Sequence, residues 1–172
     1  MTGHFDDSGF VPLNIAVLTV SDTRTDADDK SGKILQEGVT AAGHRVVEKV
    51  IVRDDVYQMR AVFSRWIADP GVHVVISTGG TGITARDSTP EAVMPLLEKP
   101  IEGFGELFRA VSREEIGPSA IQSRAVAGLT NRTLIFCLPG SSGACRTGWE
   151  KILKSQLDHR TRPCNFVQMF RA

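Results

Sequence analysis

At 172 residues, the chain is long enough to bury a substantial core without disulfide bonds or a structural metal. It has 20 basic and 20 acidic residues, and this zero net charge excludes the basic excess that nucleic-acid or membrane-surface partners normally require. No apolar segment reaches a spanning length, the N-terminus lacks a signal-peptide pattern, and three cysteines without a CxxC pair are typical of reduced thiols in the cytoplasm.

The first half of the chain alternates polar loops with apolar segments. Residues 1–11 are polar and contain glycine, so we expect a flexible N-terminal arm. Residues 13–20 form a continuous apolar run, which is typical of a strand covered on both faces. A polar, acidic loop follows at 21–29, whose acids Asp22, Asp26, Asp28 and Asp29 could supply further carboxylates to a site, but we expect them to be solvated. Apolar spacing then predicts a helix from Ser31 that stops at Gly43.

The pattern continues with a second strand at 45–52 and a helix that either Asp54 or Asp55 could cap. A turn at 69–71 leads into a third strand at 72–77. Residues 123–129 stay ambiguous. The remaining segments read as a short helix, a connector, an amphipathic helix, a buried strand and a final helix, at 91–97, 99–103, 104–111, 133–138 and 149–157.

Alternating strands and helices predict a largely parallel sheet with helices on both faces. We therefore expect an α/β protein with a three-layer α/β/α arrangement, in which residues 12–172 form a single domain. In open sheets of this kind, ligands bind at the carboxyl ends of the strands. Three polar loops follow predicted strands, at 21–29, 78–84 and 139–143, and their shared edge is the predicted site.

The central loop has three glycines in four residues, Gly79, Gly80 and Gly82. Glycine lets backbone amides approach an anion closely, and a following helix start adds its dipole. The alternative is a tight turn that only needs glycine. The helix start itself fits either a Ser88–Glu91 capping box or a cap at Thr89 followed by proline.

Two common phosphate-binding patterns do not fit this loop. A Walker A loop needs Lys and Ser/Thr after its last glycine, whereas Ile83 and Thr84 stand there. A dinucleotide turn is matched only loosely, because Arg86, Asp87 and Ser88 intervene before the helix and no suitable acid follows.

Asp87 is the carboxylate that we expect to hold Mg²⁺ on phosphates or to orient a nucleophile. The alternative is an acid placed at a helix N-terminus by the dipole. Asp54 and Asp55 could reach the same edge or cap a helix, and Arg86 could contact phosphate or be a surface charge.

The last loop contains Pro139, Gly140 and Ser141, which could line a ligand site or form an ordinary turn with a serine cap. Ser141 does not stand in a Gly-x-Ser-x-Gly elbow, so a hydrolase nucleophile is disfavoured.

The combined motifs resemble the MoaB/Mog family of molybdenum cofactor biosynthesis, and the MoaB branch in particular, across residues 12–166. The segments that carry this resemblance are LTVSD at 18–22, DKSG at 29–32, STGGTGITARDSTPEAV at 77–93, EGFGELFR at 102–109, QSRAVAG at 122–128, LPGSSGACRTGWE at 138–150 and DHRTRPCNF at 158–166.

The resemblance implies binding of molybdopterin and transfer of AMP from Mg-ATP to its phosphate, with release of pyrophosphate. It implies that Asp87 and Asp54 are catalytic and hold Mg²⁺. It also implies a homo-oligomer, a trimer or a hexamer, and a ligand site lined by Ser21, Asp22, Thr78, Gly79, Gly80, Thr81, Gly82, Pro139, Gly140 and Ser141.

Two other functions remain open: an oligomeric protein that holds or delivers molybdopterin without chemistry, and a nucleotide pyrophosphatase that acts on ATP alone. Retention of both Asp54 and Asp87 favours adenylyl transfer over simple binding.

Overall fold

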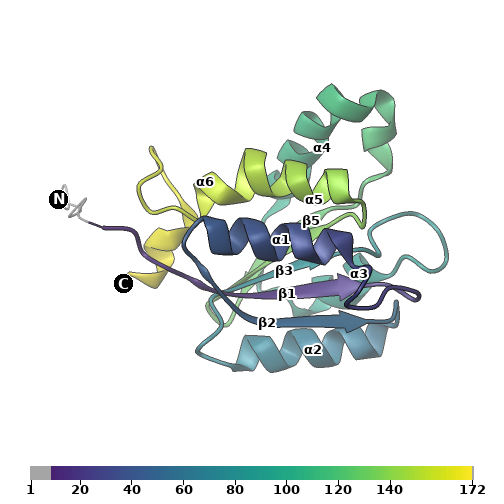
Figure 1. Ribbon diagram of the computed structural model, residues 1–172, viewed down its shortest axis with the longest axis horizontal. Coiled ribbons are helices and arrows are strands. Elements are labelled where there is room, and N and C mark those ends of the chain that lie inside the picture. The colour runs from purple at the N-terminus through teal and green to yellow at the C-terminus, as the bar shows by residue number, and fades with distance from the viewer. Residues whose placement is uncertain (1–8, 172) are drawn as a thin grey trace.

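The computed structural model describes residues 9–171, which form three layers with a six-stranded sheet in the middle (Figure 1). The predicted α/β class and the three-layer arrangement are confirmed. Within the described residues, no helix combines the length and apolar character needed to cross a membrane.

The sheet has the strand order β2-β1-β3-β6-β5-β4. β1, β2, β3 and β6 are mutually parallel, whereas β5 runs antiparallel to both of its neighbours. The strand order reverses at β1 and β3, and this is where open α/β sheets bind ligands. The strands are β1 (Asn14–Val20), β2 (Arg45–Val52), β3 (Val74–Thr78), β4 (Lys99–Pro100), β5 (Val126–Thr130) and β6 (Thr133–Leu138).

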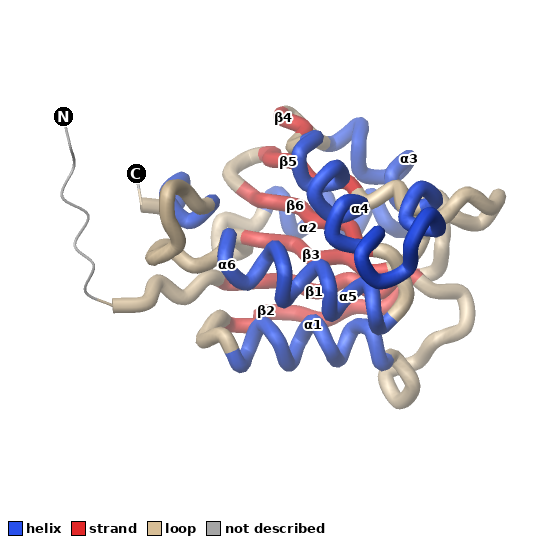
Figure 2. The backbone as a smooth tube through the Cα atoms, turned by 90° about the horizontal axis from the view of Figure 1, so that it is seen from above, coloured by secondary structure: helices blue, strands red, loops and turns tan. Residues whose placement is uncertain are grey.

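Helices cover both faces of the sheet. α1, α4, α5 and α6 lie across one face, and α2 lies on the other (Figures 1 and 2). α3 also packs on the α2 side, because Ala92 and Val93 share a core cluster with Met59 and Phe63. The α-helices are α1 (Lys30–Ala41), α2 (Val56–Ala68), α3 (Thr89–Val93), α4 (Glu102–Ile116), α5 (Ser142–Gly148) and α6 (Lys154–Gln156).

Short turns of other helix types join these elements. A π-helical turn connects α5 to α6, and a 3₁₀ turn follows α4. The turns are Met94–Leu96, Gly117–Gln122 and Phe166–Phe170 in 3₁₀ geometry and Trp149–Leu153 in π geometry.

The alternation of side chains along each strand supplies two cores, one on each face of the sheet. In β1, Ile15 and Val17 point into the core beneath α1 and α5, whereas Ala16 and Leu18 point into the core beneath α2. All four side chains are fully buried. This explains why the sequence of β1 is continuously apolar and does not alternate.

Several predicted elements shift at their ends, and two change type. The helix predicted from Ser31 is α1, and Gly43 follows its end with a φ of +92°. The predicted connector at 99–103 contains the edge strand β4, which pairs with residues 128–129. The ambiguous segment 123–129 contains most of β5.

Residues 1–8 of the predicted arm, which spans residues 1–11, lie outside the described residues. Its last part contacts the folded chain: the Phe10 ring lies 4.8 Å from the His44 ring, and the Arg160 guanidinium lies 5.4 Å from the Phe10 ring. Val11 packs against the core beneath α1.

Gly38 gives the first testable consequence of the packing. A Cβ atom at this position in α1 would lie 2.6 Å from Nε1 of Trp149, whose side chain is only 2% exposed. Helix propensity favours alanine over glycine by about 1 kcal/mol, but overpacking against a buried ring costs about 1–3 kcal/mol. We therefore expect Gly38→Ala to lower the free energy of unfolding, measured by urea denaturation.

Gly103→Ala is the matched control, because a Cβ atom there would meet nothing within 4 Å. We expect this change in α4 to leave stability unchanged or to raise it by up to about 1 kcal/mol. A Gly38→Ala variant as stable as Gly103→Ala would contradict the packing argument.

Candidate functional site

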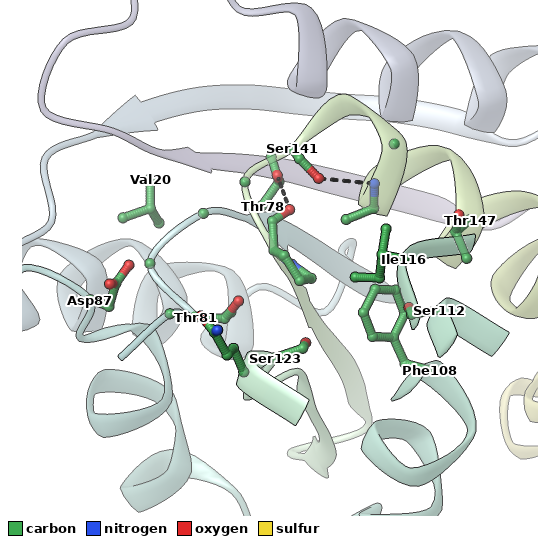
Figure 3. A pocket seen from close by; sticks show the side chains of 18 of the residues that line it. Val20, Thr78, Thr81, Asp87, Phe108, Ser112, Ile116, Ser123, Ser141 and Thr147 are labelled. Carbon is green, nitrogen blue, oxygen red and sulfur yellow. Dashed lines mark hydrogen bonds between the residues drawn. The ribbon is translucent and has the colours of Figure 1, made fainter. Parts of the chain in front are cut away.

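The three predicted loops meet at the carboxyl ends of β1, β3 and β6, where they line a cavity of about 600 Å³ (Figure 3). This volume is in the range of small-molecule sites. Asp22 and Asp54 lie just outside the lining. The other predicted site residues all line the cavity: Ser21, Thr78, Gly79, Gly80, Thr81, Gly82, Asp87, Pro139, Gly140 and Ser141.

Two glycines of the central loop are required by their conformation. Gly79 and Gly80 have φ values of +102° and +69°, which side chains rarely adopt. A Cβ atom on Gly79 would lie 2.2 Å from the Val20 carbonyl oxygen, and one on Gly80 would lie 2.3 Å from Oγ1 of Thr89. The tight-turn alternative is therefore confirmed, and this tight turn forms part of the cavity wall.

Thr89 and Arg124 donate hydrogen bonds to the carbonyl oxygens of this loop. Thr89 donates from Oγ1 to the Gly79 carbonyl at 2.8 Å and from its amide to the Gly80 carbonyl at 2.9 Å. The Arg124 amide donates to the Thr81 carbonyl at 3.2 Å, and Arg124 Nε donates to the Gly82 carbonyl at 2.7 Å. Because C=O and N–H point in opposite directions across a trans peptide, these bonds turn the amides of residues 80–83 away from Thr89 and Arg124.

Asp87 lies at one end of the cavity, and its carboxylate is held by its own loop (Figure 3). Oδ2 accepts hydrogen bonds from Oγ1 of Thr84 at 2.6 Å and from the Thr84 amide at 2.9 Å. The Thr84 hydroxyl is the largest cause that lowers the pKa of Asp87, and the amides of Thr84 and Gly82 lower it further. Asp87 is thus a fixed anion at neutral pH and is poorly suited to act as a proton-transfer base.

Asp54 lies behind the loop and contacts it from the end of β2. Its Oδ1 accepts hydrogen bonds from both the amide and the hydroxyl of Ser88, the amide bond being 3.2 Å long. Its Oδ2 would lie 2.8 Å from a Cβ atom on Gly80. Helix α2 is instead capped by Asp55, which accepts hydrogen bonds from the amides of Tyr57 and Gln58. Asp54 is therefore free of a capping role in that helix.

Asp22 bridges two parts of the rim. Its Oδ1 accepts a hydrogen bond from the Asp54 amide at 3.2 Å, and its Oδ2 pairs with the Arg86 guanidinium at 2.6 and 2.9 Å. The hydrogen bond from Arg86 lowers the pKa of Asp22. Both side chains are exposed, at 66% for Arg86 and 36% for Asp22, so we assign this ion pair little stability.

The loop after β6 packs directly on the glycine loop. A Cβ atom on Gly140 would lie 3.3 Å from Cα of Gly79. The Gly140 carbonyl accepts hydrogen bonds from Oγ of Ser31 at 2.8 Å and from Nη2 of Arg24 at 3.1 Å. Ser141 caps α5 through a hydrogen bond from the Ala144 amide at 3.1 Å (Figure 3). The structure thus bears out the serine-cap interpretation at a position that also lines the cavity.

One acid of the 21–29 loop differs from the prediction of a solvated loop. Asp29 is fully buried, caps α1 at the Gly32 amide and pairs with Nζ of Lys49 at 2.8 Å. Burial alone would raise the pKa of Asp29, but the bonds from Lys49, Gly32 and Thr19 hold it below its usual value. Its charge is therefore structural, and the expectation of solvation was wrong for this residue.

The far wall of the cavity comes from α4, the 3₁₀ turn after it and α5, and the sequence patterns did not single it out. It combines an apolar floor with hydroxyl, amide and carboxylate groups, and it lies opposite Asp87 (Figure 3). Phe108 lies in the amphipathic helix predicted at 104–111, and it is also buried in the core beneath α1 and α5. The wall residues are Phe108, Ser112, Glu115, Ile116, Ser119, Gln122, Ser123, Ala144 and Thr147.

No cluster of three or more His, Cys, Asp or Glu side chains suited to a metal ion occurs among the described residues. Cys137 and Cys145 are buried and free, and burial raises the pKa of their thiols to about 12 and about 11. Both thiols are therefore protonated at neutral pH and are not nucleophiles.

Comparison with known proteins assigns the family. A family model described as "Probable molybdopterin binding domain" matches residues 16–159. Molybdenum cofactor biosynthesis protein B of Escherichia coli strain K12 is 57% identical over 157 residues, which cover 91% of this chain and 92% of that protein. The chain belongs to the MoaB/Mog family of molybdenum cofactor biosynthesis.

Other members agree with this assignment. The protein B of Bacillus cereus is 47% identical over 146 residues, or 84% of this chain and 86% of that protein. A crystal structure of a Molybdenum cofactor biosynthesis protein B has a TM-score of 0.87 and 42% identity and covers 94% of this chain and 98% of its own. The tungsten cofactor synthesizing protein MoaB of Pyrococcus furiosus has a TM-score of 0.74 and 39% identity, covering 82% and 90%. The predicted family is confirmed.

In this MoaB-family protein, the contact between Thr84 and Asp87 predicts a pH dependence. The folded-state pKa of Asp87 is lowered, so its stabilisation is present above the unfolded-state pKa of about 3.9 and is lost as pH falls through the folded-state value. Thr84→Val removes the 2.6 Å hydroxyl donor. We expect the pKa of Asp87 to rise, and stability at pH 7 to fall by about 1 kcal/mol.

Urea denaturation from pH 7 downwards and a ¹³C titration of the Asp87 carboxyl would measure both effects. Thr40→Val is the control, because its hydroxyl donates to the uncharged Gln36 carbonyl at 2.9 Å. Its stability change should not depend on pH. A Thr84→Val change that is equally independent of pH would contradict the assignment.

Proposed function

We propose that this protein binds molybdopterin in the cavity and transfers AMP from Mg-ATP to the molybdopterin phosphate, with release of pyrophosphate. The single observation that carries this proposal is the placement of Asp87. Its carboxylate lies beside a glycine loop whose carbonyls are held away, at one end of a cavity of about 600 Å³. The family and the named relatives support molybdopterin as the ligand.

The cavity matches a ligand with two chemically different ends. The glycine loop and the Pro139–Ser141 loop offer backbone amides without side chains in the way, which suits phosphate oxygens. The opposite wall offers the Phe108 ring together with hydroxyls, the Gln122 amide and the Glu115 carboxylate. These groups suit a flat heterocycle that carries hydrogen-bond donors and acceptors.

The residues also fit Mg²⁺, a hard cation with oxygen ligands. Mg²⁺ is usually held by one or two carboxylates together with substrate phosphates and waters, so a cluster of three protein acids is not required. Asp87 lines the cavity as an ionised carboxylate. Asp54 contacts the same loop, because it accepts a hydrogen bond from the amide of Ser88, the residue after Asp87, and lies close to Gly80. We propose that these two acids hold the metal. When bound, the metal would neutralise phosphate charge and assist departure of pyrophosphate.

In the proposed reaction, a molybdopterin phosphate oxygen bonds to the α-phosphorus of ATP while the bond from that phosphorus to the bridging oxygen breaks. The electron pair leaves with pyrophosphate. The nucleophile is already anionic, so the site needs no strong base. The residues of the chain instead align the two phosphates in line and stabilise the charge of the transition state. The absence of His and Lys from the cavity lining of the described chain agrees with this requirement.

Asp87→Asn tests the proposal, because it keeps the side-chain shape and removes the charge. We expect adenylyl transfer to fall about 100-fold or more, with molybdopterin binding retained. Pyrophosphate release and adenylated product would be followed with molybdopterin and Mg-ATP. Asp69→Asn is the matched control: Asp69 also accepts a backbone amide, from Gly71 at 2.8 Å, but lies just after α2, at the opposite end of the helix from Asp54 and Asp55.

The same assay separates the alternative functions. If the wild type and Asp87→Asn both bind molybdopterin and neither forms product, the protein is a binding or delivery protein and adenylyl transfer is refuted. If product forms from ATP alone without the pterin, the protein is a nucleotide pyrophosphatase. Only product that requires both substrates and is lost in Asp87→Asn supports the proposal.

We also propose that the protein is a homo-oligomer, a trimer or a hexamer. The support from this chain is a set of exposed apolar side chains on α4 and the 3₁₀ turn after it, Leu107, Ile116 and Ile121, which are 47%, 55% and 83% exposed. Exposed apolar side chains grouped on neighbouring segments are typical of a surface that binds a partner.

Light scattering should therefore give a mass of three or six times the 18.7 kDa chain. Ile121→Lys should lower this mass, since it would place a charge in an apolar contact. Tyr57→Lys, at a 76% exposed position on α2, is the control and should leave the mass unchanged. A wild-type mass of one chain would contradict the proposed assembly.

A further inference from the structure

Arg124 stands in the QSRAVAG segment, between the 3₁₀ turn after α4 and β5, and it is not one of the residues that line the cavity. Its side chain is nevertheless directed at the glycine loop. Nε donates to the Gly82 carbonyl at 2.7 Å, and Nη2 donates to the Asp87 carbonyl at 3.0 Å. With its own amide on the Thr81 carbonyl, Arg124 holds three carbonyls of the segment that carries Asp87.

Two of these three peptide groups also contact the proposed catalytic acids. The peptide between Thr81 and Gly82 gives its C=O to the backbone amide of Arg124, and its N–H donates a hydrogen bond that lowers the pKa of Asp87. The Arg124 side chain holds the other side of Gly82, through the Gly82 carbonyl at 2.7 Å. The peptide between Asp87 and Ser88 gives its C=O to Arg124 at 3.0 Å and its N–H to Oδ1 of Asp54 at 3.2 Å. Because the peptide is planar, fixing the carbonyl also fixes the direction of the amide.

The chemistry of this contact requires arginine. Lysine has a single ammonium group, whereas the planar guanidinium presents several N–H donors in fixed directions. Arg124 uses them on two carbonyls and on both carboxylate oxygens of Glu91, one of them at 3.3 Å. The Glu91 pair compensates the charge of a side chain that is only 33% exposed. It does so without contact to either carbonyl.

We propose that Arg124 is a positioning residue that sets the directions of the Asp87 and Asp54 carboxylates through the two peptide groups it holds. This proposal rests on the adenylyl transfer proposed above for its effect on rate. The positioning itself is a statement about the loop and can be measured without substrates.

The test uses Arg124→Met and Arg124→Lys in the full chain, with Arg65→Met as the matched control. Arg65 also pairs bidentately with a carboxylate, that of Glu48, at 2.8 and 2.9 Å, but on the exposed surface of β2 and α2. A second control, Glu91→Gln, removes the charge partner and leaves the two carbonyl contacts of Arg124. Melting temperatures would show that each variant is folded.

The first measurement is amide hydrogen exchange of Gly82 and Ser88, which reports local opening of the loop. We expect clearly faster exchange of the Ser88 amide in Arg124→Met, because the Asp87 carbonyl of that peptide loses Nη2. We expect a smaller increase at the Gly82 amide, because the Gly82 carbonyl loses Nε while the Thr81 carbonyl keeps the Arg124 backbone amide. Arg124→Lys should have intermediate rates, and Arg65→Met and Glu91→Gln should have wild-type rates. Wild-type exchange at both amides in a folded Arg124→Met variant would overturn the proposal.

The second measurement is steady-state kinetics at several Mg²⁺ concentrations. Displacement of reacting groups by about 1 Å can cost about 100-fold in rate, so we expect kcat of Arg124→Met to fall to a comparable extent. The Mg²⁺ concentration for half-maximal rate should rise, while KM for molybdopterin changes little. A fall in rate caused only by a higher KM for molybdopterin would contradict a positioning role.

The two measurements keep the two proposals apart. If the wild type forms no adenylated product, adenylyl transfer fails, and the exchange rates of Gly82 and Ser88 alone decide whether Arg124 positions the loop. If the wild type is active and Arg124→Met has wild-type exchange and kcat, the positioning role fails and adenylyl transfer stands.

Discussion

The carbonyl oxygens of residues 79–82 are the points at which the rest of the chain holds the glycine loop. Thr89 takes two of them and Arg124 takes the other two, so the loop cannot rotate its peptides without breaking hydrogen bonds at buried or half-buried atoms. An unmade bond of this kind costs about 1–3 kcal/mol. Loop direction, cavity shape and the setting of Asp87 all depend on this restraint, and glycine at 79 and 80 is what makes it sterically possible.

Three acidic side chains lie around this loop, although the chain has no net charge. Asp22, Asp54 and Asp87 converge at one end of the sheet, next to amides suited to an anion. Two like charges 4 Å apart repel by about 1 kcal/mol in water and by about 4 kcal/mol at the lower effective dielectric of a protein surface. Arg86 pairs with Asp22, and Arg24 lines the cavity, so part of this charge is already compensated. In the proposed function, Mg²⁺ shared between carboxylate and phosphate offsets the remaining repulsion at Asp54 and Asp87.

Features that depend on neighbours in sequence were predictable. The glycine loop follows a buried strand directly, and the continuous apolar run of β1 predicts that this strand is buried on both faces. Features that depend on distant partners were not. The Lys49 partner that makes Asp29 buried, the β5 strand that makes 99–100 a strand, and the contact from Arg124 to a carbonyl 42 residues away leave no local pattern. Asp29 was predicted to be solvated only because the surrounding loop is polar.

The same distinction explains why the cavity has two unlike ends. The end at Asp87 is built from loops that follow parallel strands, whose carboxyl ends must meet at one edge of the sheet. The end at Phe108 and Glu115 is formed by α4, which follows the edge strand β4 in the chain. The position of α4 is determined by its packing against β5 and β6. In the proposed function, the loops after the parallel strands bind phosphate, whereas α4 contacts the rest of the ligand and discriminates between ligands. Changes in α4 should alter which ligand is accepted before they alter whether phosphate is held.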